Sequence, residues 1–392
     1  FRPTFLPLGD GQLCSKAMDD RSCFVTLLRM AELLQNEALD VDLYLMGSTR
    51  EEISGAGAVT GTRAVAPDFC VAVDVTHGKT PDAPADRASI IGGGPAGLSC
   101  AYFLALQGYK PTVFEKNPHP GGMLRYGIPG YRLPRERLQA DIDCILSTGV
   151  EVRRETGVGK GEGMISMEKL REDYDAVFIS IGAHDDKKLG IPNEDAEGVL
   201  SAVDMMGAIG DGIMPDFKGK RVCVVGGGNV AMDCTRSAIR CGAEKVSIVY
   251  RRRVVDMTAQ TEEVQGALEE GAEMLDLHAP VSIEVNCDGH VTGLWTEPKQ
   301  VGLIHNRRAD VIGSGRAPEL IPCDVVVVAV GQSIDAQYFA EEGIPIKRGV
   351  IDAQEWTAVD NAEGVFAGGD CVTGPKTAIR AIAAGKVAAA NI

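Results

Sequence analysis

The residues with the clearest chemical potential are three glycines, Gly92, Gly94 and Gly97, spaced as G-x-G-x-x-G. They follow the apolar run Arg87–Ile91 and open a stretch with helical character. In that setting the first glycine permits a tight turn, the second lets the backbone approach a pyrophosphate, and the third lets helix pack on strand. The helix N-terminus adds free N–H groups and partial positive charge. The pattern predicts a dinucleotide cradle; a glycine turn in another α/β fold is the alternative.

A carboxylate supports this interpretation. The next apolar run, Pro111–Phe114, ends in Glu115, about 20 residues beyond the glycines. A carboxylate at that point accepts hydrogen bonds from ribose hydroxyls in dinucleotide-binding folds. For Glu115 alone, an exposed acid at a strand end is the alternative.

A second glycine motif, Gly226, Gly228 and Ala231, follows the apolar run Arg221–Val225 in the spacing G-x-G-x-x-A. The strand expected next, at 246–250, ends in the basic run 251–253 instead of an acid. Guanidinium groups clamp a 2′-phosphate, whereas a carboxylate would repel it. This site is therefore expected to prefer NADPH over NADH, with a solvated basic turn as the alternative.

Near the C-terminus, an apolar run from Gly364 ends in the pair Gly369-Asp370, and a helical pattern begins near Thr377 and Ala378. An aspartate in that position can accept from a sugar-alcohol hydroxyl. The helix N-terminus can place N–H groups near a flavin ring edge. An aspartate that caps a turn is the alternative.

Four carboxylates in the first 86 residues could serve a different chemistry: Asp19, Glu51, Glu52 and Asp74. Acids at strand ends of an α/β fold suit a divalent metal, and a neighbouring glutamate can act as base for a metal-bound water. Solvated or capping acids are the alternative for each residue taken singly.

The elements that must position these residues follow from apolar runs that feed glycines and then helices. This order is typical of parallel sheets with crossover helices. A third, weaker unit is 325–330 followed by Gly331. The first 86 residues differ, with a helix expected at 24–34, strands at 41–46 and 69–73, and a Pro/Asp-rich linker at 81–86. Two nucleotide-binding domains after a separate leading segment are expected.

Composition narrows the function classes. The 392 residues are 45% hydrophobic, and 39 basic against 55 acidic residues give a net charge of −16. This balance disfavours nucleic acid and membrane surfaces as partners, and no apolar run has the length of a membrane span. The 11 cysteines contain no C-x-x-C pair, which predicts reduced thiols in the cytoplasm and no iron–sulfur cluster with local ligand spacing.

Residues 87–392 resemble the FAD/NAD(P)-dependent oxidoreductases of the glutamate synthase small-subunit (beta chain) type, which include the NADPH-reducing half of dihydropyrimidine dehydrogenase. The matching motifs are 91–98, 121–129 with 131–134, 226–233, 250–252 and 366–370. The resemblance implies that FAD is bound by Gly92, Gly94, Pro95, Ala96, Gly97, Glu115, Gly122, Met123, Arg132, Val158, Gly369, Asp370, Thr377 and Ala378. It implies that NADPH is bound by Gly226, Gly228, Asn229, Val230, Arg251, Arg252, Ala329 and Gly331.

The resemblance also implies an architecture and an activity. The FAD-binding domain would be split into 87–200 and 320–392, with an NADPH-binding domain at 201–319 between the parts. Hydride would pass from NADPH to FAD, and electrons onward to an iron–sulfur or partner-subunit acceptor. The family's cysteine-rich N-terminal segment has no counterpart here. Because the chain opens at Phe1 and stops inside a helical pattern, we expect it to be a fragment.

Residues 1–86 resemble part of the dinuclear-metal aminopeptidases that form tetrahedral dodecamers, through 16–21, 50–52 and 73–76. The resemblance implies zinc or cobalt held by Asp19, Glu52 and Asp74, with Glu51 as general base. That family also needs an upstream His-x-Asp and a downstream histidine, which this segment lacks. We therefore expect no peptidase activity. We also expect the chain to be a chimera of two unrelated fragments, joined near the glycine run at 92–96 by recombination or by sequence assembly.

Three functions are compatible with the sequence. An NADPH:acceptor flavoprotein is favoured, a metal aminopeptidase is the alternative from the hydrolase class, and a cofactor-binding structural subunit without turnover is the third. Bleaching of flavin absorbance by NADPH separates them.

Overall fold

A computed structural model of the chain describes residues 5–8, 12–15, 18–47, 56–73, 87–161, 163–305 and 308–392. The chain divides into two compact units, Phe1–Lys79 and Thr80–Ile392. The first unit contains an antiparallel hairpin and two helices: β1 (Phe5–Leu8), β2 (Gln12–Ser15), α1 (Met18–Leu34) and α3 (Ala56–Val65). The helix expected at 24–34 is confirmed, and it begins earlier.

The two strands expected in the first unit were wrong. Residues 41–46 and 69–73 are irregular, and Val41 and Phe69 are 70% and 93% exposed. A strand needs a neighbour for its N–H and C=O groups, and no described strand pairs with either segment. The apolar residue types alone could not supply that neighbour.

The second unit opens with a five-stranded parallel sheet, called the first sheet here. Its order is β20 (Val365–Ala367), β6 (Ala176–Ile179), β3 (Arg87–Ile91), β4 (Lys110–Phe114) and β5 (Glu151–Arg153). The chain fills β3, β4 and β5 in one direction and then returns to the other side of β3 with β6. Such a reversal opens a crevice at the carboxyl ends of the strands, where ligands bind in open α/β sheets.

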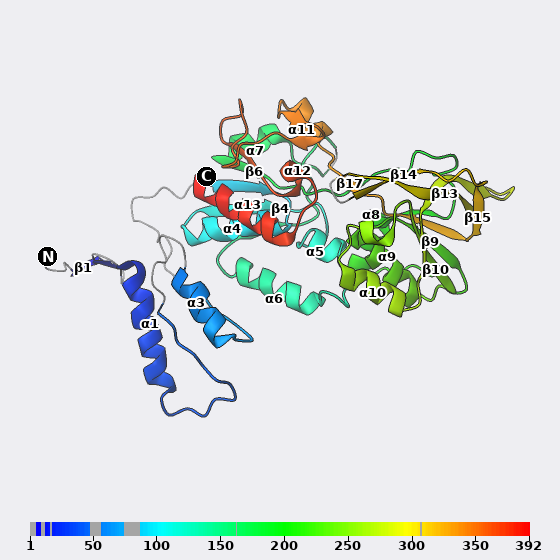
Figure 1. The fold of residues 1–392 in the computed structure, drawn as a ribbon. Coiled ribbons are helices and arrows are strands. Elements are labelled where there is room, and N and C mark those ends of the chain that lie inside the picture. Colours follow the sequence, from blue (N-terminus) through cyan, green and yellow to red (C-terminus); the bar gives the residue numbers. More distant parts are fainter. Residues whose placement is uncertain are drawn as a thin grey trace. The chain divides into compact units, whose positions relative to one another are not determined.

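Helices and short strands complete this part: α4 (Pro95–Leu106), α5 (Met123–Tyr126), α6 (Arg135–Leu146), α7 (Met167–Asp173), α11 (Gln337–Glu341), β18 (Ile346–Lys347), β19 (Val350–Ile351), α12 (Asp370–Thr373) and α13 (Ala378–Asn391). Helix α13, red in Figure 1, lies along α4. The Ser99 hydroxyl of α4 donates to the carbonyl oxygen of Ile382 at 2.9 Å. The C-terminal helix is thereby packed on the helix that follows the first glycine motif.

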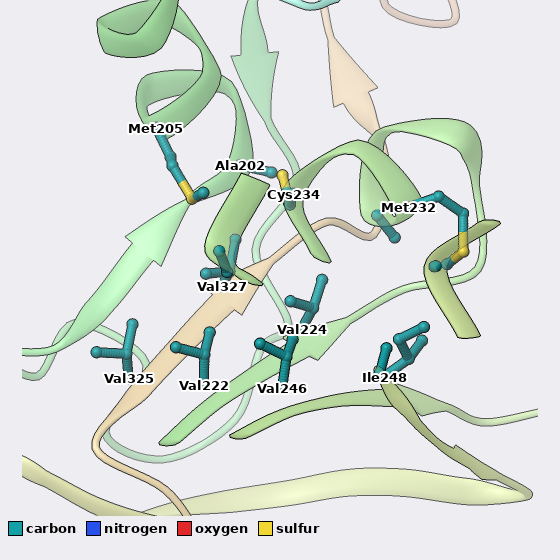
Figure 2. Close-up of a cluster of buried hydrophobic side chains, with 14 of the residues drawn as sticks. Ala202, Met205, Val222, Val224, Met232, Cys234, Val246, Ile248, Val325 and Val327 are labelled. Atoms are coloured by element: carbon teal, nitrogen blue, oxygen red, sulfur yellow. The ribbon is translucent and has the colours of Figure 1, made fainter. Parts of the chain in front are cut away.

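A second parallel sheet has the order β11 (Glu273–Asp276), β10 (Lys245–Tyr250), β9 (Arg221–Val225), β16 (Val325–Val328) and β8 (Val199–Ser201). One face carries α8 (Ala202–Gly210), α9 (Asn229–Arg240) and α10 (Thr261–Glu269), with a 3-10 turn η1 (Val254–Asp256) before α10. Figure 2 shows the core between them, in which valines and an isoleucine of β9, β10 and β16 meet Met205, Met232 and Cys234 of the helices.

The other face of the second sheet is covered by an antiparallel sheet that the sequence did not predict. Its strands are β12 (His278–Val285), β13 (Val291–His305), β14 (Arg308–Gly313) and β15 (Glu319–Pro322). Ile283 and Leu294 pack on Val326 and Val328 of β16. The second sheet is therefore buried on both faces, as its continuous valine runs indicate.

The chain passes between the two sheets in a small antiparallel ribbon of β7 (Asp185–Asp186) and β17 (Gln332–Ser333). Strand β16 pairs with β9 and β8, although 320–392 was expected to belong with the first sheet. We therefore propose 187–331 as the limits of the inserted domain. No described helix combines the length and apolar character that crossing a membrane requires.

Candidate functional site

The first glycine motif forms the turn from β3 to α4, at the reversal of the first sheet. Gly92 has φ of +102°, and a Cβ added there would lie 2.5 Å from the carbonyl oxygen of Ser180 at the end of the neighbouring strand. A Cβ at Gly97 would overlap the carbonyl oxygen of Gly92. No side chain caps the N-terminus of α4, so its first-turn N–H groups are open to a phosphate.

Glu115 reaches back from the end of β4 to this turn. Its side chain is 3% exposed and accepts hydrogen bonds from the backbone N–H groups of Gly93 and Asn117, both at 2.8 Å. Burial raises the pKa of Glu115, and these two hydrogen bonds oppose the rise. The carboxylate is fixed at the glycine turn, while its contact with a ribose remains a prediction.

Two distant segments converge on the same turn. The Gly121 N–H donates to the carbonyl oxygen of Gly93 at 2.7 Å, and a Cβ at Gly122 would lie 2.7 Å from the Cα of Gly94. From the C-terminal part, a Cβ at Gly369 would lie 2.9 Å from the Cβ of Ala96. Gly121 and Gly122 thus approach the first glycine turn through backbone atoms, and Gly369 approaches it at the Ala96 side chain.

The remaining residues predicted for FAD lie around this centre. The Asp370 carboxylate accepts from the Lys376 N–H at 3.1 Å, and burial raises its pKa. Thr377 is the N-cap of α13 without a side-chain cap bond, so the first turn from Ala378 is open. Val158 packs beside the core of the first sheet, and Met123 begins α5 with its sulfur 4.0 Å from the amide nitrogen of Gln332.

The second glycine motif repeats the arrangement at the reversal of the second sheet. It joins β9 to α9, and a Cβ at Gly226 would overlap the carbonyl oxygen of Ala329, just after β16. The segment after η1 holds this turn. Gln260 N–H donates to Asn229 Oδ1 at 2.9 Å, and the N–H groups of Thr258 and Ala259 both donate to the Gly227 carbonyl at 3.0 Å. Gly228 is the N-cap of α9 and makes no side-chain cap bond, and Val230 lies in the first turn of that helix. The segment 329–331 lies beside the glycine turn at Gly226.

The three arginines after β10 are not equivalent. The Arg252 guanidinium donates to the carbonyl oxygen of Ala309 at 2.7 Å, and Arg253 forms a two-point ion pair with Asp256 at 2.7 and 2.9 Å. Arg251 is exposed, and within the described part of the chain no hydrogen bond or ion pair holds its side chain. Of the predicted pair, Arg251 is therefore the one whose guanidinium is available to an incoming anion.

Arg132 lies in a setting that the sequence did not predict. Its guanidinium is paired with Asp233 of α9 and Glu263 of α10. A guanidinium with both ends engaged has little capacity left for a pyrophosphate. The geometry gives no support to the expected FAD contact. Neither acidic partner was predicted from the sequence, although Asp233 ends the stretch 226–233 that carries the family resemblance.

The residues predicted for metal lie mostly outside the described part of the chain. Glu51, Glu52 and Asp74 fall on residues that the structure does not describe, and Asp19 is located only as a backbone position in α1. Among the described residues, no group of three or more His, Cys, Asp or Glu side chains could hold a metal ion.

Both turns fit the phosphates of a dinucleotide. At each one the glycines bring two backbones closer than side chains would allow, and the helix that follows has no side-chain cap. This combination leaves the first-turn N–H groups of α4 and α9 without a side-chain cap at the reversal of a parallel sheet, where a phosphate can accept from them.

Two family models match the chain in succession. Residues 86–385 match the model described as pyridine nucleotide-disulphide oxidoreductase. Residues 1–100 match the model described as M42 glutamyl aminopeptidase. The resemblance of each segment is confirmed, and the two matches overlap at the first glycine motif.

Curated relatives agree with the first match. The chain is 41% identical over 322 residues to the NADP(+)-dependent formate dehydrogenase subunit beta of Moorella thermoacetica, covering 81% of this chain and 44% of the relative. It is 38% identical to the NADPH-Fe(3+) oxidoreductase subunit beta of Geobacter sulfurreducens, covering 76% and 48%. It is 35% identical to the glutamate synthase [NADPH] small chain of Escherichia coli, covering 78% and 68%. The chain thus spans about half the length of the first two.

Solved structures share the fold at lower identity. FprA of Mycobacterium tuberculosis, in complex with NADPH, has a TM-score of 0.66 at 19% identity and covers 79% of this chain and 84% of that one. Thioredoxin reductase of Lactococcus lactis has a TM-score of 0.59 at 22% identity, covering 78% and 97%. The predicted fold, two dinucleotide-type α/β domains with one inserted in the other, is confirmed. With two glycine turns at two sheet reversals and a family match across most of its length, the chain belongs to the pyridine nucleotide-disulphide oxidoreductase family.

Proposed function

We propose that residues 87–392 bind FAD and NADPH and transfer a hydride from NADPH to FAD, from which electrons pass to a further acceptor. One observation carries the proposal: a single folded unit holds two glycine turns, each at the reversal point of its own parallel sheet. The names of the relatives, which specify NADPH or NADP(+), support the choice of nucleotide.

Bound FAD would supply a two-electron acceptor for the hydride, so the protein needs no acid or base of its own for that transfer. The task of the chain is to bind and orient. The N-terminus of α4 neutralises a pyrophosphate, Glu115 orders the glycine turn and accepts from a ribose, and Asp370 accepts from a sugar-alcohol hydroxyl. The open first turn of α13 directs N–H groups at the flavin edge.

The second sheet would bind NADPH. The first turn of α9 receives the pyrophosphate, and Arg251 binds the 2′-phosphate as an unengaged guanidinium at the end of β10. Arg252 supports this role indirectly, since its bond to Ala309 fixes the backbone of the same turn. Of the two arginines predicted from the sequence to bind the 2′-phosphate, Arg251 and Arg252, we therefore propose Arg251 alone as its ligand.

The electron acceptor is proposed to be an iron–sulfur protein or a partner subunit. The relatives are named subunit beta or small chain, and the sequence offers no cysteine set with local cluster spacing. The scattered cysteines, with no C-x-x-C pair, support a place in the cytoplasm. The net charge of −16 disfavours nucleic acid and anionic membrane surfaces as partners.

Anaerobic titration tests the proposal. The purified chain, reconstituted with FAD, should show flavin absorbance that bleaches when NADPH is added and returns when a one-electron acceptor such as ferricyanide follows. A colourless protein that does not take up FAD would contradict the proposal. A yellow protein that NADPH does not bleach would favour the structural-subunit alternative.

A further inference from the structure

The two parallel sheets are connected by more than the covalent ribbon of β7 and β17. The segment 127–134, which follows α5 on the side of the first sheet, carries Tyr131 and Arg132. Arg132 contacts helices α9 and α10 of the inserted domain, and Tyr131 contacts α9. A second contact brings the backbone of Arg125 close to Gly210 of α8.

Arg132 makes the strongest of these contacts. Its Nη1 lies 2.8 Å from both carboxylate oxygens of Asp233, and its Nη2 lies 2.8 Å from Glu263. The side chains of Asp233 and Glu263 are 4% and 14% exposed. One guanidinium therefore binds two helices of the inserted domain at once, in a geometry that only a planar fork of donors allows.

Tyr131 adds an aromatic contact beside this ion pair. The guanidinium carbons of Arg240 and Arg236 lie 4.1 and 5.1 Å from its ring centre. Glu270 holds both arginines at 2.8 Å. The Tyr131 ring therefore makes cation–π contacts with two arginines of α9, in the inserted domain.

The ion pair lies close in sequence to the glycine turn of each domain. Asp233 lies about one helical turn beyond the start of α9, the helix that follows the second glycine turn at Gly226. Arg132 lies shortly after Met123 and the pair Gly121–Gly122, which contacts the first glycine turn. The ion pair therefore joins a segment close to the first glycine turn to the helix that follows the second glycine turn.

The energetics favour a role in orientation over one in stability. Burial raises the pKa of Asp233 to about 6, even though Arg132 and Arg236 favour its charged form and only Glu263 adds to the rise. Replacing a buried ion pair by apolar residues is often neutral for stability, whereas separating its partners leaves a charge buried and unpaired. The Arg132–Asp233 pair therefore disfavours arrangements of the two domains that separate its partners.

We propose that Arg132 and Asp233 are positioning residues that fix the inserted domain against the first sheet in the orientation that hydride transfer needs. The inference rests on the proposed function, and it gives Arg132 a task other than binding FAD. Neither residue needs to touch either nucleotide for this task.

The test compares Arg132→Met, Asp233→Asn and the double variant with the unaltered chain, all reconstituted with FAD. Arg221→Met is the matched control, because it removes an ion pair with Asp324, at 2.7 Å, that lies within the inserted domain. Stopped-flow bleaching at increasing NADPH separates the nucleotide dissociation constant from the limiting rate of flavin reduction. Hydrogen exchange of 127–134 and of α9 and α10, in the FAD-free protein, reports the contact without any turnover.

We expect each single variant to lower the limiting rate about tenfold or more, because small misplacements of reacting atoms have large kinetic effects. The NADPH dissociation constant and the FAD content should stay within about twofold, and the double variant should lose no more than the worse single variant. Exchange should accelerate in 127–134 in both single variants and not in Arg221→Met.

Two results would overturn the inference. Loss of FAD from Arg132→Met with full retention in Asp233→Asn would make Arg132 a flavin ligand after all. Unchanged limiting rates in both single variants would remove the positioning role. Failure of the unaltered chain to bleach would instead refute the proposed function, and the exchange measurement would then show separately whether the contact exists.

Discussion

At the scale of single residues, the two glycine turns differ in what accompanies them. The first turn is held by a buried carboxylate and the second by backbone donors from the segment after η1. The acid after β4 and the exposed guanidinium after β10 carry opposite charge at equivalent positions of two similar folds. Charge at these two positions is therefore expected to decide which nucleotide each sheet takes.

Arg251 provides the test of nucleotide choice. Replacing it in Arg251→Gln removes the free guanidinium, so the affinity for NADPH should fall by about 1.5–3 kcal/mol, the range of a charged hydrogen bond, with little change for NADH. Dissociation constants for both nucleotides from flavin bleaching check this. Arg316→Gln, an exposed arginine in the same inserted domain, is the control. Equal losses for NADPH and NADH would refute the 2′-phosphate assignment.

Glu115 tests the first cradle. In Glu115→Gln the amide can accept only one of the two backbone N–H groups that now bind the carboxylate, leaving a buried donor unpaired at about 1–3 kcal/mol. We expect lower FAD content and a lower free energy of unfolding in urea. Glu151→Gln, on an exposed strand-end ion pair, should change neither. Full FAD retention in Glu115→Gln would show that the carboxylate is not needed at the turn.

At the scale of elements, α13 packs on α4, the helix that follows the first glycine turn. Gly385 is buried in α13, and a Cβ there would overlap the carbonyl oxygen of Ala96 and lie 2.9 Å from the nitrogen of Cys100. Any side chain at this position must push the C-terminal helix away from α4, the helix proposed to bind the FAD pyrophosphate.

Gly385→Ala is therefore expected to destabilise the protein by about 1–3 kcal/mol, the range found for overpacking, and to weaken FAD binding through displacement of Thr377 and Asp370. Thermal unfolding and FAD titration measure the two effects. Ala383→Ser, at an exposed position of the same helix, is the control. If Gly385→Ala binds FAD normally, α13 does not close the site.

At the scale of the whole molecule, two family matches share one polypeptide. The compact unit Phe1–Lys79 contains the peptidase-like residues, and the flavin chemistry is proposed for the other unit. We expect a chain that begins at residue 80 to keep its FAD affinity and NADPH bleaching unchanged. We also expect the full chain to show no peptide cleavage with added zinc or cobalt. Loss of flavin binding in the shortened chain would show that the first unit contributes to the site.

The junction itself can be tested directly. The family matches overlap at residues 86–100, which contain the glycine run 92–94. One DNA read from the source genome across codons 80 to 100 decides the origin of the join. An uninterrupted read would establish a genuine fusion, and an interrupted one would identify an assembly error.

Much of this protein follows from local sequence. Apolar β-branched runs, glycine turns and helical patterns all act within a few residues. They predict the strands β3, β4, β9 and β10 and the helices α4 and α9. The two cradles were predictable for the same reason, because a glycine turn between strand and helix carries its own phosphate-binding geometry.

Tertiary structure decided what depends on distant partners. Residues 41–46 and 69–73 have strand-like composition but no neighbouring strand, and the antiparallel sheet from β12 to β15 arises because the second face of the valine-rich sheet must be covered. Arg132 belongs to a motif that suggested FAD, yet it pairs with Asp233, which is 101 residues away in the sequence. A buried carboxylate needs a cation beside it. Which cation lies close enough depends on how folding brings distant segments together, and the sequence alone does not give that distance.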